Sequence, residues 1–201
     1  MQKWSLFLMI AAVSTMGFVT EVLPIGSKLP EPDLKMKDIS GNEMTMKSIA
    51  KKNGLLVMFS SNGCPYVIKN EQRTLTIAEY ALRNNIGVVL LNSNEAQRNE
   101  DDSFEAMKNY AKSLQYRWPY LLDENSVVAN AFDAKRTPEV FLFNRDLTLV
   151  YHGAIDDNPA DELAVTRQHL REAINEMVNE KSITVKETKG IGCIIMRKKK
   201  G

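Results

Sequence analysis

The sequence contains few cysteines and histidines and has almost no net charge. Only two of its 201 residues are cysteines, Cys64 and Cys193, too few for a small domain held together by disulfides. The formal net charge of +1 leaves little surplus charge for steering polyanions. We therefore expect a fold that rests on its hydrophobic core, no nucleic acid among its partners, and a cysteine pair that is free for chemistry.

No metal-ligand pattern is present either. The two histidines, His152 and His169, are far apart, and no cysteines are spaced as a metal-binding pair. We expect no metal and no cofactor, and a structural or exposed role for both histidines rather than general base catalysis. The sequence also lacks internal repeats and low-complexity linkers, so it predicts one domain, over residues 25–197.

Residues 1–19 differ in character from the rest of the chain. Lys3 precedes an apolar run, and no further charge occurs before Glu21. This pattern is typical of an export signal peptide, and if it is not cleaved it would serve as a membrane anchor, although it is short for a spanning helix. We expect a periplasmic or extracellular protein, in an oxidising compartment where the two cysteines could persist as a disulfide.

The stretch around Cys64 reads as a buried strand, a tight turn and a helix start. Residues 55–60 are apolar or small without alternation, as expected for a strand covered on both faces. Residues 62–63, Asn-Gly, form a turn, and Pro65 suits the first position of a helix. Cys64 is then the N-cap, where free N–H groups and the helix dipole favour a thiolate. Cys64 is a candidate nucleophile, and the alternative is a small buried residue at a helix cap.

The remaining elements predict an α/β fold. Residues 34–46 form an N-terminal strand extension, and residues 55–92 form a strand-helix-strand unit with parallel strands, its long helix ending near Asn84. Further predicted elements are a helix after the capping-box sequence of residues 102–105, a short helix over 123–132, strands over 139–143 and 147–151, and a last helix that begins at residues 158–159. We expect a central mixed sheet flanked by helices.

Six blocks of sequence are informative together, namely residues 59–67, 92–94, 119–123, 137–143, 151–157 and 192–195. They resemble the peroxiredoxin-like redoxins of the thioredoxin superfamily, which include the alkyl hydroperoxide reductase and thiol-specific antioxidant proteins. The resemblance implies a thioredoxin-like fold in which a cis Pro138 faces Cys64 and the Thr137-Pro138 pair shapes the substrate groove. It also implies an oxidoreductase that acts on a thiol, a disulfide or a peroxide through Cys64, with an external thiol as reductant.

The sequence departs from this family at one important position. Many members carry a Cys-x-x-Cys pair in this turn, but here Ser61 occupies the first position, and Cys64 has no near partner. Cys193 is then either a resolving cysteine or half of a static bridge, which would close 129 residues and contribute about 5 kcal/mol at most. The loss of the pair also allows a redox-inactive member that binds a partner protein. The oligomeric state stays open.

A peroxidase is the other alternative. Peroxiredoxins place a Thr or Ser three residues before the reactive cysteine, as Ser61 stands before Cys64, and Arg136 lies two residues from the usual position of their peroxide-polarising arginine. Ser61 would either donate a hydrogen bond to the thiolate or cap the turn. In this reading Cys193 is the resolving cysteine.

Overall fold

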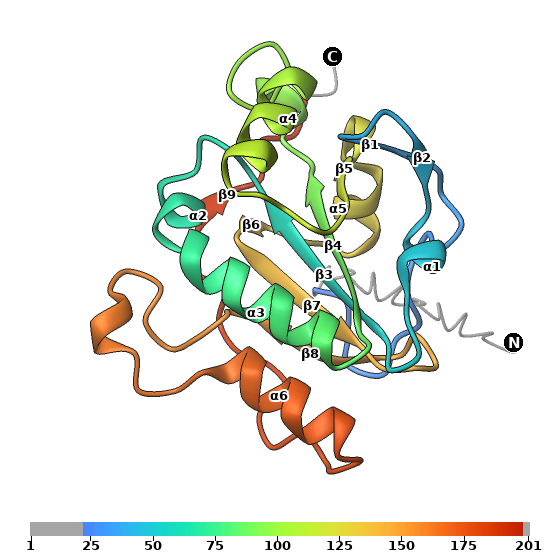
Figure 1. Ribbon diagram of the computed structural model, residues 1–201, viewed down its shortest axis with the longest axis vertical. Helices are drawn as coiled ribbons and strands as arrows, with labels where there is room; N and C mark the ends of the chain where they lie inside the picture. The colour runs from blue at the N-terminus through green and yellow to red at the C-terminus, as the bar shows by residue number, and fades with distance from the viewer. Residues whose placement is uncertain (1–21, 199–201) are drawn as a thin grey trace, which may run out of the picture.

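The computed structural model describes residues 22–198. The predicted export signal in residues 1–19 lies outside this part of the chain. Figure 1 shows a central twisted sheet with helices on both sides. No helix within residues 22–198 is long and apolar enough to cross a membrane.

The central sheet has seven strands in the order β2-β1-β5-β4-β3-β7-β8. Strands β3, β4 and β5 are parallel, whereas β7, β8, β1 and β2 join by antiparallel pairing. The strands are β1 (Met36–Asp38), β2 (Glu43–Met44), β3 (Leu55–Ser60), β4 (Gly87–Asn92), β5 (Tyr120–Leu122), β7 (Glu139–Phe143) and β8 (Leu149–Gly153). This mixed sheet, with its N-terminal extension of β1 and β2, confirms the predicted thioredoxin-like α/β fold.

Strand β3 lies at the centre of the core. All six of its residues are buried, and the side chains alternate between two apolar layers, Leu56 on one face and Val57 on the other. Helices α3, α4 and α6 cover the Leu56 face, and α1 and α5 cover the Val57 face. The helices are α1 (Met46–Ile49), α2 (Pro65–Lys69), α3 (Glu71–Arg83), α4 (Phe104–Ser113), α5 (Val127–Ala131) and α6 (His169–Val178), with short 3₁₀ turns η1 (Glu95–Gln97), η2 (Glu124–Ser126) and η3 (Glu162–Ala164).

Two predicted helices differ from the structure. The long helix after Cys64 is broken at Asn70, which ends α2 and begins α3, and whose side chain donates to the carbonyl of Pro159, 3.1 Å away. The last helix begins at His169 instead of residues 158–159, because the carbonyls of those residues accept hydrogen bonds from buried Arg73 and hold the chain as a loop. Tertiary hydrogen bonds override the local helix signal in both places.

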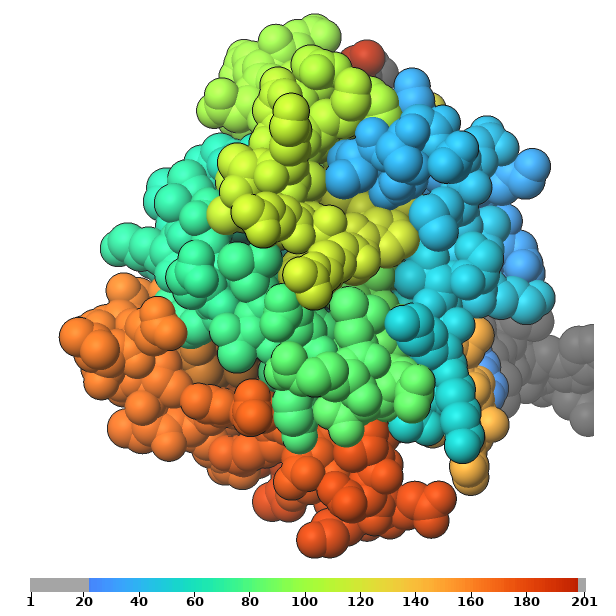
Figure 2. Space-filling view, viewed as in Figure 1, coloured from blue at the N-terminus to red at the C-terminus, as the bar shows by residue number. Residues whose placement is uncertain are grey.

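The C-terminal segment crosses the sheet end that carries Cys64. Its short strand β9 (Cys193–Ile194) pairs antiparallel with β6 (Arg136–Thr137) as a separate two-stranded sheet. In Figure 1, β9 and β6 lie beside α2. The space-filling view from the same side shows mainly the helices and the N-terminal strands, with little of the red C-terminal segment (Figure 2).

Candidate redox site

Cys64 stands where the buried strand β3 passes into helix α2. It is the N-cap of that helix, with extended backbone angles and Pro65 following as the first helical residue. The predicted strand-turn-helix around Cys64 is therefore confirmed. Only 3% of Cys64 is exposed, so the surrounding chain restricts which groups can reach its sulfur.

The partner of Cys64 comes from the other end of the chain. Cys64 and Cys193 are joined by a disulfide with their Cα atoms 6.0 Å apart, within the usual range for such bonds. Cys193 is half-buried, on β9. The fold thus brings together the only two cysteines of the sequence, which are 129 residues apart.

Strand β6 supports both cysteines. Thr137 pairs with Cys193 in the β6–β9 ladder, and its carbonyl oxygen lies 3.1 Å from Sγ of Cys64. The Thr137–Pro138 peptide bond is cis, as the family resemblance implies. Gly192 allows this approach, since a Cβ atom there would lie 2.2 Å from the Thr137 oxygen. The site therefore consists of two sulfurs held around one backbone strand.

Ser61 and Arg136 contact the backbone and side chains beside the sulfurs. The hydroxyl of buried Ser61 donates to a carboxylate oxygen of Asp102, 2.9 Å away. The guanidinium of Arg136 donates to the carbonyl of Gly192, also at 2.9 Å. These bonds fix the turn before Cys64 and the residue before Cys193.

The role of Asp102 was not apparent from the sequence. Its position suggested the start of a capping box, but Ser103 is the N-cap of α4. The Asp102 carboxylate is fully buried and accepts hydrogen bonds from Ser61, the backbone N–H of Asn62, and the side chains of Asn92 and Asn94. The only hint in the sequence was the cluster of amides directly after a buried strand.

Glu139 is a second residue whose role was not apparent from the sequence. It is 5% exposed, and its carboxylate accepts the backbone N–H groups of Lys135 and Arg136 at 2.8 and 3.0 Å. Burial raises the pKa of this carboxyl above its usual value, and the two hydrogen bonds partly offset that rise. Glu139 thus fixes the turn that leads into β6. A lone acid at the start of an apolar strand was its only signal.

Within residues 22–198, no group of three or more His, Cys, Asp or Glu side chains is arranged to hold a metal ion. Fold and site together define a thioredoxin-fold protein with a cysteine disulfide at the start of the helix that follows its central strand, beside a cis-proline strand.

Comparison with known proteins narrows this class to a family. The redoxin family model matches residues 24–170, most of the chain, and the protein belongs to the redoxin family. A comparison with curated proteins finds no match.

Solved structures of similar proteins share the fold. An uncharacterized conserved protein from Geobacillus kaustophilus is 31% identical with a TM-score of 0.82, the match covering 89% of this chain and 95% of that one. A hypothetical protein from Sinorhizobium meliloti is 32% identical with a TM-score of 0.80, covering 89% and 97%. The thioredoxin domain of a thiol-disulfide oxidoreductase from Bacteroides vulgatus is 18% identical with a TM-score of 0.55, covering 66% and 89%. Peroxiredoxins share the fold as well.

Proposed function

We propose that the protein is an exported thiol-disulfide oxidoreductase whose reacting bond is the Cys64–Cys193 disulfide. The observation that carries this proposal is the pairing itself. A cysteine at the start of the helix after the central strand is bonded to a cysteine on an extended segment that runs along the cis-proline strand. Membership of the redoxin family and the oxidoreductases among proteins of the same fold support it.

Burial favours an order of attack. Cys64 is 3% exposed, whereas Cys193 is half-buried, so an outside thiolate reaches the sulfur of Cys193 more readily. Attack there forms a substrate–Cys193 disulfide and releases Cys64 as a thiolate. This order assigns Cys193 the exchange with substrate and Cys64 the resolving step, the reverse of the roles expected from the sequence.

A second substrate thiolate completes the reaction. It attacks the substrate sulfur of the mixed disulfide, which frees Cys193 as a thiolate. The substrate gains one disulfide and loses two electrons and two protons, and the protein gains them as two thiols. The reverse sequence reduces a substrate disulfide and restores the Cys64–Cys193 bond.

Export is part of the proposal. Structural and catalytic disulfides persist in oxidising compartments and are rare where thiols are kept reduced. The bonded state of the two cysteines and the signal-like residues 1–19 support a periplasmic or extracellular location.

The proposal is tested by measuring turnover of a small disulfide and of a dithiol. Each substrate is assayed with the wild-type protein and with the Cys64→Ser and Cys193→Ser variants. Both variants should lose turnover. The Cys64→Ser variant, which keeps the more exposed Cys193, should accumulate more mixed disulfide with substrate than the Cys193→Ser variant does. Full turnover without either cysteine would overturn the proposal, and mixed disulfide forming mainly on Cys64 would overturn the order of attack.

A static bridge in a redox-inactive binding protein is the second candidate. Its support is the number of contacts that hold the segment carrying Cys193, among them the Ile195 N–H donating to the Lys135 carbonyl at 2.9 Å. A Cys64→Ser variant that keeps the full biological activity of the protein would favour this candidate.

A peroxidase with Cys193 as resolving cysteine has less support. The hydroxyl of Ser61, which would have donated toward a thiolate or peroxide, donates to Asp102. Turnover that requires peroxide and does not occur with disulfide substrates would favour the peroxidase function.

A further inference from the structure

We propose that Asp102 is a positioning residue that holds the two cysteine-bearing segments in register and thereby sets how readily the Cys64–Cys193 bond forms. This inference rests on the proposed function, because it concerns the same bond. The Asp102 carboxylate is buried and makes no hydrogen bond to either sulfur. Its hydrogen bonds connect it to the chain near Cys64 and, through Asn94, to the chain near Cys193.

The first link runs to the turn that carries Cys64. One oxygen of the Asp102 carboxylate accepts the Asn62 N–H at 2.8 Å, and the other accepts the Ser61 hydroxyl at 2.9 Å. Tyr120 donates its hydroxyl proton to the Asn62 side chain at 3.0 Å and strengthens the same turn. Asp102 therefore holds the two residues that stand two and three positions before Cys64, Asn62 through its backbone and Ser61 through its side chain.

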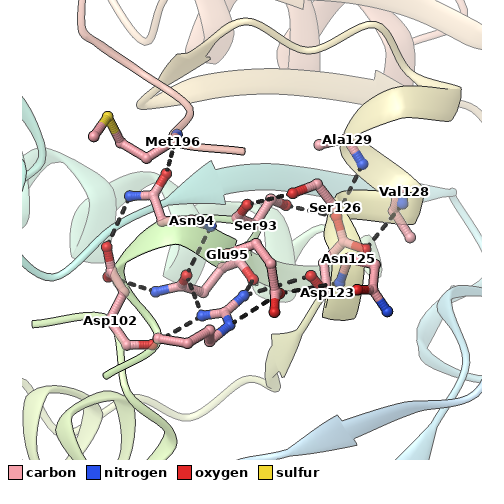
Figure 3. Close-up of polar contacts among 12 residues, drawn as sticks. Ser93, Asn94, Glu95, Asp102, Asp123, Asn125, Ser126, Val128, Ala129 and Met196 are labelled. Carbon is pink, nitrogen blue, oxygen red and sulfur yellow. Dashed lines mark hydrogen bonds and ion pairs between the residues drawn. The ribbon is translucent and has the colours of Figure 1, made fainter. Parts of the chain in front are cut away.

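The second link runs through Asn94 to the segment that carries Cys193. The Asn94 amide nitrogen donates to Asp102 at 2.7 Å, and its oxygen accepts the backbone N–H of Met196 at 2.8 Å. Figure 3 shows Asn94 between Met196 and Asp102. The Met196 carbonyl in turn accepts the N–H of Ala96 at 2.9 Å. A chain of two side chains thus joins the Cys64 turn to the backbone three residues after Cys193.

The network requires both side-chain oxygens of residue 102 to accept hydrogen bonds. Arg98 donates to the side-chain oxygen of Asn92 at 2.7 Å, which turns the Asn92 amide nitrogen toward Asp102 at 2.6 Å. The Met196 N–H fixes the orientation of Asn94 in the same way. Asparagine at position 102 would place an NH₂ group where an acceptor is needed, and a buried donor without an acceptor is costly.

Asp123 offers a matched control. It is also fully buried in the neighbouring loop, where it accepts the Ser93 hydroxyl and the N–H groups of Val128 and Ala129 (Figure 3). These partners belong to neither cysteine-bearing segment. Within residues 22–198, the one hydrogen bond between them and those segments is made by the Ala129 carbonyl, which accepts from the Arg197 side chain at 3.2 Å, whereas Asp123 accepts the Ala129 N–H. Asp123→Asn should therefore weaken the fold without changing the register of the two cysteines.

The test is the equilibrium of the folded protein with dithiothreitol, measured by trapping free thiols in wild type, Asp102→Asn, Asn94→Ala, the double variant and Asp123→Asn. We expect Asp102→Asn and Asn94→Ala each to lower the equilibrium constant for forming the disulfide by about tenfold, a shift of about 30 mV. The double variant should show little more than one single change, because both remove the same link. Asp123→Asn should leave the constant unchanged.

Equal constants in wild type, Asp102→Asn and Asn94→Ala would overturn the inference, and so would the same shift in Asp123→Asn. If Asp102→Asn fails to fold, Asn94→Ala decides alone, because it keeps the contacts of Asp102 with the Cys64 turn. The measurement uses no substrate. A shift in a protein that turns over no substrate would therefore refute the proposed function alone, and substrate turnover without a shift would refute this inference alone.

Discussion

Opening the Cys64–Cys193 bond should lower the free energy of unfolding by up to about 5 kcal/mol. The bond closes a segment of 129 residues, and the chain-entropy model assigns about this value to a loop of that length. The folded segment has other anchors, since the side chain of Ile195 is 3% exposed in the core and the Met196 N–H is bonded to Asn94. Reduction should therefore lower stability mainly by raising the conformational entropy of the unfolded chain, while the folded segment stays in place.

Urea unfolding of the oxidised protein, the reduced protein and the Cys64→Ser/Cys193→Ser double variant measures this difference. The reduced protein and the variant should unfold at similar, lower urea concentrations, and both should keep the far-ultraviolet circular dichroism of the native fold. A thermodynamic cycle then requires the cysteine pair to be more reducing in the folded chain than in urea, by about 100 mV, because about 1.4 kcal/mol corresponds to 30 mV. Equal unfolding midpoints, or equal potentials in folded and unfolded protein, would refute the reasoning.

Three further outcomes follow from single contacts. Gly192→Ala should slow disulfide formation, because its Cβ would lie 2.2 Å from the Thr137 oxygen; the fraction of free thiol after air oxidation measures this, with equal fractions counting against it. The raised pKa of Glu139 means that its stabilising contribution is present below about pH 4.5 and is lost as pH rises through the folded value. Glu139→Gln should therefore lose less stability than wild type as the pH of urea titrations rises above 4.5; identical slopes would contradict this. Burial raises the pKa of Tyr151 to about 12 from 10.0, so the contribution of Tyr151 to stability should fall by about 1.4 kcal/mol per pH unit in that window. Tyr151→Phe should make the pH dependence of stability shallower by this amount and should also lose the hydrogen bond to the Ala154 carbonyl.

The part of the site that is continuous in sequence could be predicted. The apolar run of β3, the Asn-Gly turn and the proline at the start of α2 are local signals, and each fixes the backbone through its own residues. The Thr137–Pro138 pair before β7 is equally local, and its cis bond followed from the family resemblance. These signals placed Cys64 correctly at a helix start.

The long-range contacts could not be predicted in the same way. Asp102 carried a local capping signal, yet its carboxylate bonds to Ser61, 41 residues earlier in the chain. Asn70 lies inside a helical pattern, yet its side chain bonds to Pro159, 89 residues later, and the helix breaks there. Side-chain hydrogen bonds between distant segments leave no periodicity in the sequence, so the pattern alone favours the local structure.

The pairing of the two cysteines lies between these cases. The sequence contains only two cysteines, so only one pairing is possible, but no local pattern indicates that the two lie within bonding distance. The match between β6 and β9, with Thr137 opposite Cys193 and Arg136 bonded to Gly192, provides that proximity. A turn with one cysteine thus obtains its partner from the C-terminal segment instead of from position 61.

The central claim is that the Cys64–Cys193 bond opens and closes in the folded protein. The most direct test is to expose the native oxidised protein briefly to a small dithiol, block free thiols with an alkylating reagent and count the added groups by mass spectrometry, while circular dichroism follows the fold. We predict that both cysteines become alkylated while the native spectrum is kept, and that removing the dithiol and adding a disulfide oxidant restores the bond. A bond that opens only after the protein has been unfolded would contradict the claim and identify the pair as a static bridge.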